Sequence, residues 1–171
     1  MLKSLNPEHI EQVLRLINQG PYFKLLSMEV RDMGRGFSRV EMDIDQKHLN
    51  PFGGIHGGVY ASLIDTATYW AVYCDVEESA GLISLDLQVD HLAPVKEGHV
   101  VVEGKRLKAG RHICLAEAAV RDSHGKVLAR GTSKQMVVPG LQTIAQAVSA
   151  MGHAALAVKF LGSRQGEGDP W

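Results

Sequence analysis

The sequence predicts an α+β domain in which a curved antiparallel sheet of about six strands wraps around one long central helix. Residues 58–75 are apolar on nearly every helical face, which is typical of a helix buried all round. Six strand-like segments surround it in the sequence, at residues 25–31, 37–45, 81–95, 99–108, 111–122 and 126–138. With 171 residues, 45% of them apolar and 22% charged, the chain has the size and composition of one compact domain.

An extra helix is expected before the first strand, over about residues 7–19. Asn6 is a favourable N-cap residue and Pro7 suits the first helical position. Apolar side chains then recur at helical spacing, at Ile10, Val13, Leu14 and Ile17. The Gly20-Pro21 pair should end this helix.

Turn-forming residues connect the expected strands. Gly34 and Gly36 supply a hairpin between the first two strands, and turn sequences at residues 108–111 and 122–125 join the later ones. Tight turns between successive strands favour an antiparallel sheet, and a sheet of this kind curled around one helix is the hotdog architecture.

After Pro139-Gly140 the sequence predicts a second extra helix, over residues 141–161. Its apolar positions are spaced alternately three and four apart, at Leu141, Ile144, Val148, Met151, Ala155 and Val158. Such a seam should pack on the domain formed by residues 1–140 or on a partner subunit, and residues 162–171 are expected to form a flexible tail.

Charge and cysteine content restrict the class of protein. Eighteen basic against nineteen acidic residues give a net charge of −1, so nucleic acid and anionic membranes are not expected partners. Cys74 and Cys114 are expected to be reduced thiols, and the amino terminus turns acidic before any apolar run of signal length, which favours a cytoplasmic protein. The uncharged stretch at 135–158 carries too many polar residues to span a membrane.

Asp65 is the only charged residue of the central helix. No basic side chain lies three or four positions away, where the residues are Ala61, Ser62, Thr68 and Tyr69. Burying an unpaired carboxylate costs several kcal/mol, so Asp65 should either reach a cleft or join a hydrogen-bonded core network. The residues alone leave both interpretations open.

The glycine-rich loop at residues 53–58 opens the same helix. Unsatisfied N–H groups and the positive end of the helix dipole could stabilise a developing oxyanion there, although a plain tight turn would have the same pattern. Gly57 and Asp65 are eight residues apart, which is about 12 Å along a helix. If both groups serve one reaction, they must come from different subunits of an obligate dimer.

These residues resemble the hotdog-fold acyl-CoA thioesterases of the phenylacetate-pathway type. The resemblance spans about residues 25–138 and lies in the string Asn50-x-x-Gly53-x-x-His56-Gly57-Gly58, in Asp65 within LIDTA, and in the strand SLDLQVDHLAPV. It implies a dimer with a continuous sheet, commonly paired into a homotetramer. The segment after residue 140 is longer than this family usually carries.

The resemblance also implies a role for each matched residue. Asp65 would be the catalytic carboxylate, as a general base on water or as a nucleophile that forms an anhydride. The Gly57 N–H and the Asn50 side chain would polarise the thioester carbonyl from the other subunit, His56 would organise the loop, and Ser84 would lie near the attacking water. Either role of Asp65 needs the ionised carboxylate, so activity should be lost at low pH.

Coenzyme A enters as part of the substrate, and no separate cofactor is expected. Phe52, Gly58 and Tyr60 are candidates for substrate contacts, whereas Lys108 and Arg111 flank a turn where they could meet the phosphates or simply be solvated. The aromatic side chains of the central helix suit a ring-bearing acyl group, although core packing is the simpler explanation.

Other chemistries find less support in the sequence. No metal site is expected, because no H-E-x-x-H motif occurs and the cysteines lie forty residues apart. No G-x-S-x-G elbow indicates a serine hydrolase. The remaining alternatives are an acyl-CoA hydratase or dehydratase and a non-catalytic acyl-CoA-binding module, and the acyl group itself is not specified.

Overall fold

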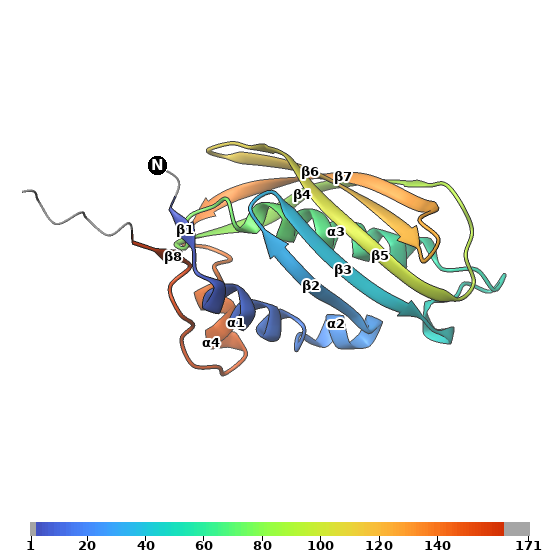
Figure 1. Cartoon of the computed structure of the whole chain (residues 1–171), viewed down its shortest axis with the longest axis horizontal. Coiled ribbons are helices and arrows are strands. Elements are labelled where there is room, and N and C mark those ends of the chain that lie inside the picture. Colours follow the sequence, from blue (N-terminus) through green and yellow to red (C-terminus); the bar gives the residue numbers. More distant parts are fainter. Residues whose placement is uncertain (1–2, 163–171) are drawn as a thin grey trace, which may run out of the picture.

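The computed structural model describes residues 3–162 and shows a six-stranded antiparallel sheet curled around one helix (Figure 1). The strand order is β2-β3-β5-β6-β7-β4, so β2 and β4 are the two edges. The strands of this sheet are β2 (Met28–Gly34), β3 (Phe37–Ile44), β4 (Ala80–His91), β5 (Gly98–Ala109), β6 (Ile113–Asp122) and β7 (Val127–Pro139). The helix is α3 (Gly57–Tyr73), and the predicted fold class is confirmed.

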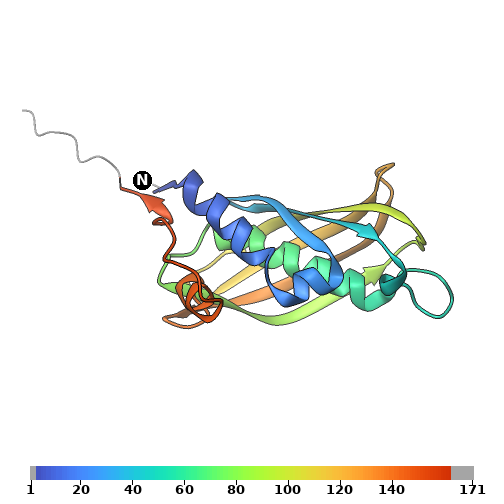
Figure 2. The same cartoon turned by 90° about the horizontal axis from the view of Figure 1, so that it is seen from below.

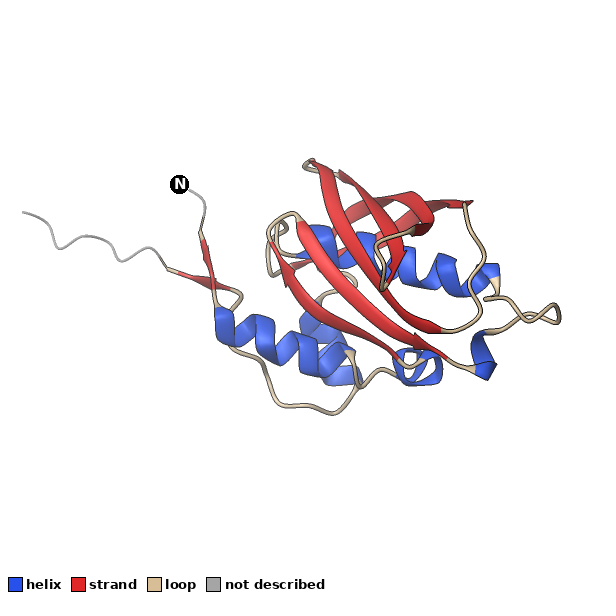
Figure 3. Cartoon of the chain, turned by 45° about the vertical axis from the view of Figure 1, so that its right-hand side comes forward, coloured by secondary structure: helices blue, strands red, loops and turns tan. Residues whose placement is uncertain are grey.

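Helix α3 lies in the concave face of the sheet (Figure 3). Leu63, Ile64 and Ala67 have no exposed surface, as expected for a helix that is apolar on every face. The sheet approaches α3 closely at Gly104 of β5, where a Cβ would come within 2.3 Å of the Ala67 carbonyl oxygen. Ser38 of β3 donates a hydrogen bond to the same oxygen at 2.6 Å, so the helix is fixed in position against the sheet.

Helices α1 (Pro7–Ile17), α2 (Pro21–Leu26) and α4 (Ile144–Ala150) lie on the side of α3 away from the sheet (Figure 2). The expectation that the first strand begins at residue 25 is wrong, because Pro21 starts the new helix α2 there. Ser27, in the left-handed conformation with φ 50°, ends α2, and β2 begins only at Met28. The N-terminal helix also ends at Ile17 rather than near residue 19.

The strand predicted over residues 81–95 ends early, at His91. Leu92 and Ala93 both donate to the Leu128 carbonyl, and Pro94 has no N–H to continue a ladder. The bounds of the other long strands agree with the predicted ones to within two residues.

The continuous helix predicted over residues 141–161 is wrong. Only α4 is helical, and Gly152, with φ 71°, stands just beyond its end in a conformation that L side chains rarely adopt. The chain then runs back to form β8 (Phe160–Leu161), which pairs with β1 (Ser4–Leu5). The tail predicted for 162–171 lies outside the described residues except for Gly162, which is exposed.

Within residues 3–162, no helix is both long and apolar enough to cross a membrane. Cys74 and Cys114 are buried free thiols, as predicted.

Candidate active site

Asp65 points out of the middle of α3 toward the edge strand β4. It is half-buried, and Ser84 Oγ of β4 donates a hydrogen bond to Asp65 Oδ1 at 3.0 Å. No salt bridge to Asp65 forms within the part of the chain that the structure describes. Of the two interpretations left open by the sequence, the structure therefore favours a carboxylate at a cleft rather than one in a core network.

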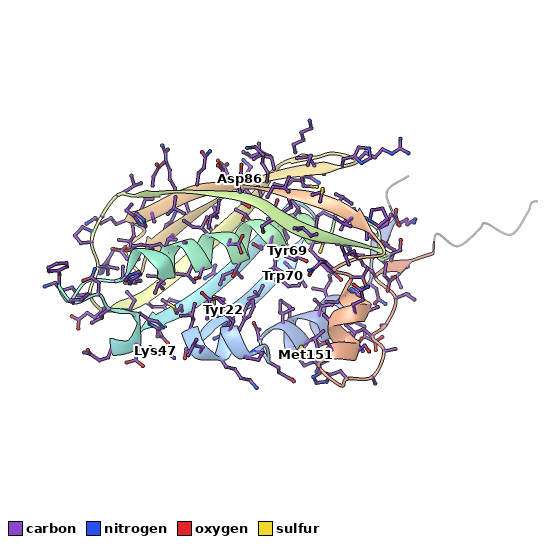
Figure 4. The ribbon with its side chains drawn as sticks, turned by 180° about the vertical axis from the view of Figure 1, so that it is seen from behind. Tyr22, Lys47, Tyr69, Trp70, Asp86 and Met151 are labelled. Carbon is purple, nitrogen blue, oxygen red and sulfur yellow. The ribbon has the colours of Figure 1, made fainter. Side chains whose placement is uncertain are left out.

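A hollow of about 420 Å³ lies in front of this carboxylate. We call it the Asp65 hollow; its walls come from α3, from Leu87 of β4, and from Tyr22 and Phe23 of α2. Figure 4 labels Tyr22, Tyr69 and Trp70, which all line it. Sequence reasoning missed the contribution of α2, because that segment was expected to lead into a strand.

The loop before α3 is held by its own side chains. Asn50 Oδ1 accepts from the N–H groups of Phe52 at 2.9 Å and Gly54 at 3.3 Å, and His56 is the N-cap, its Nδ1 accepting from the Gly58 N–H at 2.9 Å. The Gly57 N–H has no acceptor among the described residues. One first-turn donor of α3 is thus available to an external acceptor.

A second hollow, of about 410 Å³, lies beside this helix start. Asn50, Gly57 and Tyr60 line it together with His91 and Pro94. Burial raises the pKa of the Tyr60 phenol to about 12, so the phenol stays protonated. We call this the helix-start hollow.

His91 is a residue of this hollow for which the sequence suggested no role. Its ring lies 3.2 Å from where a Cβ of Gly57 would be, and its centroid is 5.6 Å from that of Tyr60. His91 is the last residue of β4. The sequence predicts a strand that continues to residue 95, so it gives no indication that this ring lies beside the start of α3.

The two hollows have no lining residue in common. Gly57 and Asp65 lie on one helix about 12 Å apart, so a single chain does not bring the free N–H to the carboxylate. Strand β4, which carries Ser84, is hydrogen-bonded only to β7 within the described chain, so its outer edge is unpaired.

The remaining candidates for substrate contacts lie apart from both hollows. Phe52 is 92% exposed in the loop before α3. Lys108 and Arg111 are exposed at the turn between β5 and β6. The adjacent Cys114 packs near Ala71 and Val72, so this turn lies beyond the C-terminal half of α3, at the opposite end from Gly57 (Figure 1).

The described residues hold no cluster of three or more His, Cys, Asp or Glu side chains that could bind a metal ion.

Known proteins with a related sequence include putative esterases and acyl-coenzyme A thioesterases. The family model of the thioesterase superfamily matches residues 52–129. Acyl-coenzyme A thioesterase 13 of Mus musculus is 26% identical over 128 residues, which cover 72% of this chain and 91% of that protein. The human protein of the same name is 30% identical over 93 residues, or 53% of this chain and 66% of that protein.

Solved structures give the same result for the fold. A thioesterase from Haemophilus influenzae superposes with a TM-score of 0.73 at 25% identity, over 82% of this chain and 97% of that one. Zebra fish thioesterase superfamily member 2 superposes with a TM-score of 0.67 at 26% identity, over 78% of this chain and 99% of that one.

Proposed function

We propose, from the premise that residues 52–129 form a thioesterase-superfamily domain in a hotdog fold, that this thioester hydrolase cleaves acyl-CoA to a free acid and coenzyme A. The observation that carries the proposal is the Asp65 carboxylate, which faces a hollow and accepts a hydrogen bond from Ser84. The related acyl-coenzyme A thioesterases support the choice of thioester. Assignment to the phenylacetate-pathway type stays a prediction.

In the proposed reaction Asp65 acts as a general base. It takes a proton from a water molecule that Ser84 helps to hold, and the water oxygen bonds to the thioester carbonyl carbon. The carbon–sulfur bond then breaks, and the coenzyme A thiolate leaves and takes up a proton. Direct attack by Asp65, with an anhydride that water opens, is the alternative for the same residue.

The developing oxyanion needs donors that one chain does not place near Asp65. We assign this role to the Gly57 N–H, which is free of protein acceptors, and to the Asn50 side-chain amide of a second subunit. Pairing of the free β4 edges of two subunits would form a continuous sheet and bring each Asp65 hollow to the partner's helix start. His56 holds the loop through its bond to Gly58.

The coenzyme A portion would lie over the surface between the subunits. Phe52 and Tyr60 are near the helix start, and Lys108 and Arg111 are the basic residues that we propose for its phosphates. Lys108 and Arg111 lie far from Gly57 of their own chain. They would therefore serve the active site that contains Asp65 of their own chain and Gly57 of the partner subunit.

The test is release of free thiol from a panel of acetyl-, octanoyl-, dodecanoyl-, benzoyl- and phenylacetyl-CoA. We expect the Asp65→Asn variant to lose at least about 100-fold in kcat on the preferred substrate, because general-base catalysis contributes about 10²–10⁴-fold. Asp43→Asn is the matched control: Asp43 is exposed on β3, bonded to His99, and should leave kcat unchanged. Saturable binding of acyl-CoA with no thiol release by the unmodified protein would contradict the proposal and favour a binding module.

A further inference from the structure

The geometry points to the C-terminal extension, residues 140–162, as the part of this chain that determines the specificity for the length of the acyl group. The inference rests on the proposed function and deepens it. We propose that a straight acyl chain runs from the Asp65 hollow past Trp70 and ends against α4.

A third hollow, which we call the distal hollow, adjoins the Asp65 hollow. Its volume is about 410 Å³, and the two share Tyr69 and Trp70 as lining residues. These two rings pack edge to face with centroids 5.0 Å apart. Beyond them the wall consists mainly of apolar side chains from α1, the segment after α3, β4 and α4, including Ile17, Val76, Leu82, Ile144, Ala147 and Ala150.

The walls contributed by the extension are held in place by specific contacts. At Gly81 of β4 a Cβ would come within 2.1 Å of the Gln142 carbonyl oxygen, so only glycine lets the extension cross the strand this closely. A capping box between Thr143 and Gln146 begins α4, and Val148 is 5% exposed. These contacts fix the part of the extension that lines the distal hollow against the rest of the domain.

The distance from Asp65 sets the size of the group that would fit. The helix rises about 12 Å between Asp65 and Tyr73, which lines the distal hollow. An extended chain advances about 1.1–1.2 Å per bond, as extended polypeptide does over its three bonds per residue. A straight acyl group of about eight to ten carbons would therefore reach α4, whereas a benzoyl or phenylacetyl group would stop in the Asp65 hollow.

An acyl chain is the occupant that these observations favour. The distal hollow has a largely apolar lining, and it shares the walls formed by Tyr69 and Trp70 with the hollow that Asp65 lines. A partner subunit seated in it would be a different occupant, and it can be distinguished by experiment.

The test uses two alanines of α4. Ala147 lines the distal hollow, whereas Ala145 faces a separate hollow with Glu78 and Ser149, and both alanines are exposed enough to accept a larger side chain. We expect Ala147→Trp to lower kcat/KM for decanoyl- and dodecanoyl-CoA by about ten-fold or more, since two or more methylenes lose their apolar surroundings. The kcat/KM values of Ala147→Trp for acetyl- and phenylacetyl-CoA should stay within about two-fold of those of the unmodified protein. Ala145→Trp should leave kcat/KM unchanged for every acyl-CoA tested.

Each other outcome overturns the assignment in a recognisable way. If Ala147→Trp changes kcat/KM equally for all chain lengths, or not at all, the acyl group does not reach α4. If it instead changes the oligomeric state in size-exclusion chromatography with light scattering, a partner subunit occupies the distal hollow. If the unmodified protein hydrolyses no thioester of any length, the proposed function fails first and the chain-length assignment falls with it.

Discussion

Asp65 and Ser84 form the pair on which the proposed chemistry depends. They come from different elements, α3 and β4, and meet at a 3.0 Å hydrogen bond at the mouth of a hollow. The Ser84 hydroxyl has one hydrogen, so it can donate to only one acceptor at a time. It donates either to the Asp65 carboxylate or to the attacking water molecule, and its oxygen can accept a further hydrogen bond in either case. In both cases Ser84 acts as a positioning residue for Asp65 and its water.

Removing the Ser84 hydroxyl should slow the reaction without affecting folding. We expect Ser84→Ala to lower kcat by about ten-fold, because hydrogen bonds to charged groups are worth about 1.5–3 kcal/mol and part of this is recovered by water. KM should change little, and Ser84→Thr, which keeps the hydroxyl, should restore most of kcat. A Ser84→Thr variant as slow as Ser84→Ala, at unchanged thermal stability, would show that the hydroxyl is not what matters at this position.

At the scale of elements, a polar side chain caps each end of α3. Its start is capped by His56. Its last turn is capped by Lys159, which has no exposed surface and whose Nζ donates to the carbonyls of Tyr73 at 2.5 Å and Val76 at 2.8 Å. The Nζ also lies 3.8 Å from the centroid of the Tyr73 ring, so one side chain ties the C-terminal extension to the central helix.

Burial lowers the pKa of Lys159 to about 8, which predicts a distinctive pH dependence of stability. Between pH about 8 and the ordinary value of 10.5, the unfolded chain binds more protons at this site than the folded one, so its contribution to the free energy of unfolding rises with pH. Relative to Lys159→Met, the unmodified protein should gain about 1–3 kcal/mol between pH 7 and pH 10.

Chemical denaturation of both proteins across this pH range measures that difference. Comparison with Lys159→Met cancels the titration of the groups that do not interact with Lys159. Lys3→Met, at a lysine that is exposed beside Glu77, is the matched control and should show no such rise. A pH-independent difference for Lys159→Met would mean that Lys159 is charged to the same extent in the folded and unfolded chain.

The sequence predicts the elements that have a clear periodic pattern of apolar residues. It does not predict the elements whose ends depend on backbone conformation and tertiary contacts. Helix α3 and the six long strands follow from apolar pattern and turn residues. Helix α2 and the early end of α4 depend on Ser27 and Gly152, each in the left-handed conformation, and that conformation is not visible in a hydrophobic pattern. The apolar seam of residues 141–161 is misleading, because its members face different parts of the fold: Val148 is buried, whereas Leu141 is 50% and Val158 59% exposed.

The same distinction holds for the candidate site. Asp65 and Gly57 stand out in the sequence because their residue types are unusual in a helix and at its start. His91, Tyr22 and the distal hollow do not, because their proximity results from the crossing of segments far apart in the chain. No spacing rule within one segment could have brought them together.

At the scale of the whole molecule, the proposed active site requires two chains. One subunit places the carboxylate and the free N–H about 12 Å apart on α3, and the outer edge of β4 is unpaired within the described residues. A dimer formed through this edge would contain two equivalent active sites, each built from Asp65 of one chain and Gly57 of the other. Pairing of two such dimers into a tetramer stays a prediction.

Complementation between two inactive variants tests whether each active site is shared between two subunits. Asp65→Asn removes the carboxylate, and Gly57→Pro removes the N–H at a position whose backbone suits proline, since it is the first helical residue and His56 already has φ −70° and ψ 136°. The His91 ring, 3.2 Å from the new Cβ, has to shift by a few tenths of an ångström. Heterodimers of the two variants, isolated with two different affinity tags, should contain one intact and one doubly defective site. We predict about half of the wild-type kcat per dimer, from parents that are each nearly inactive; heterodimers as inactive as both parents would contradict an active site shared between subunits.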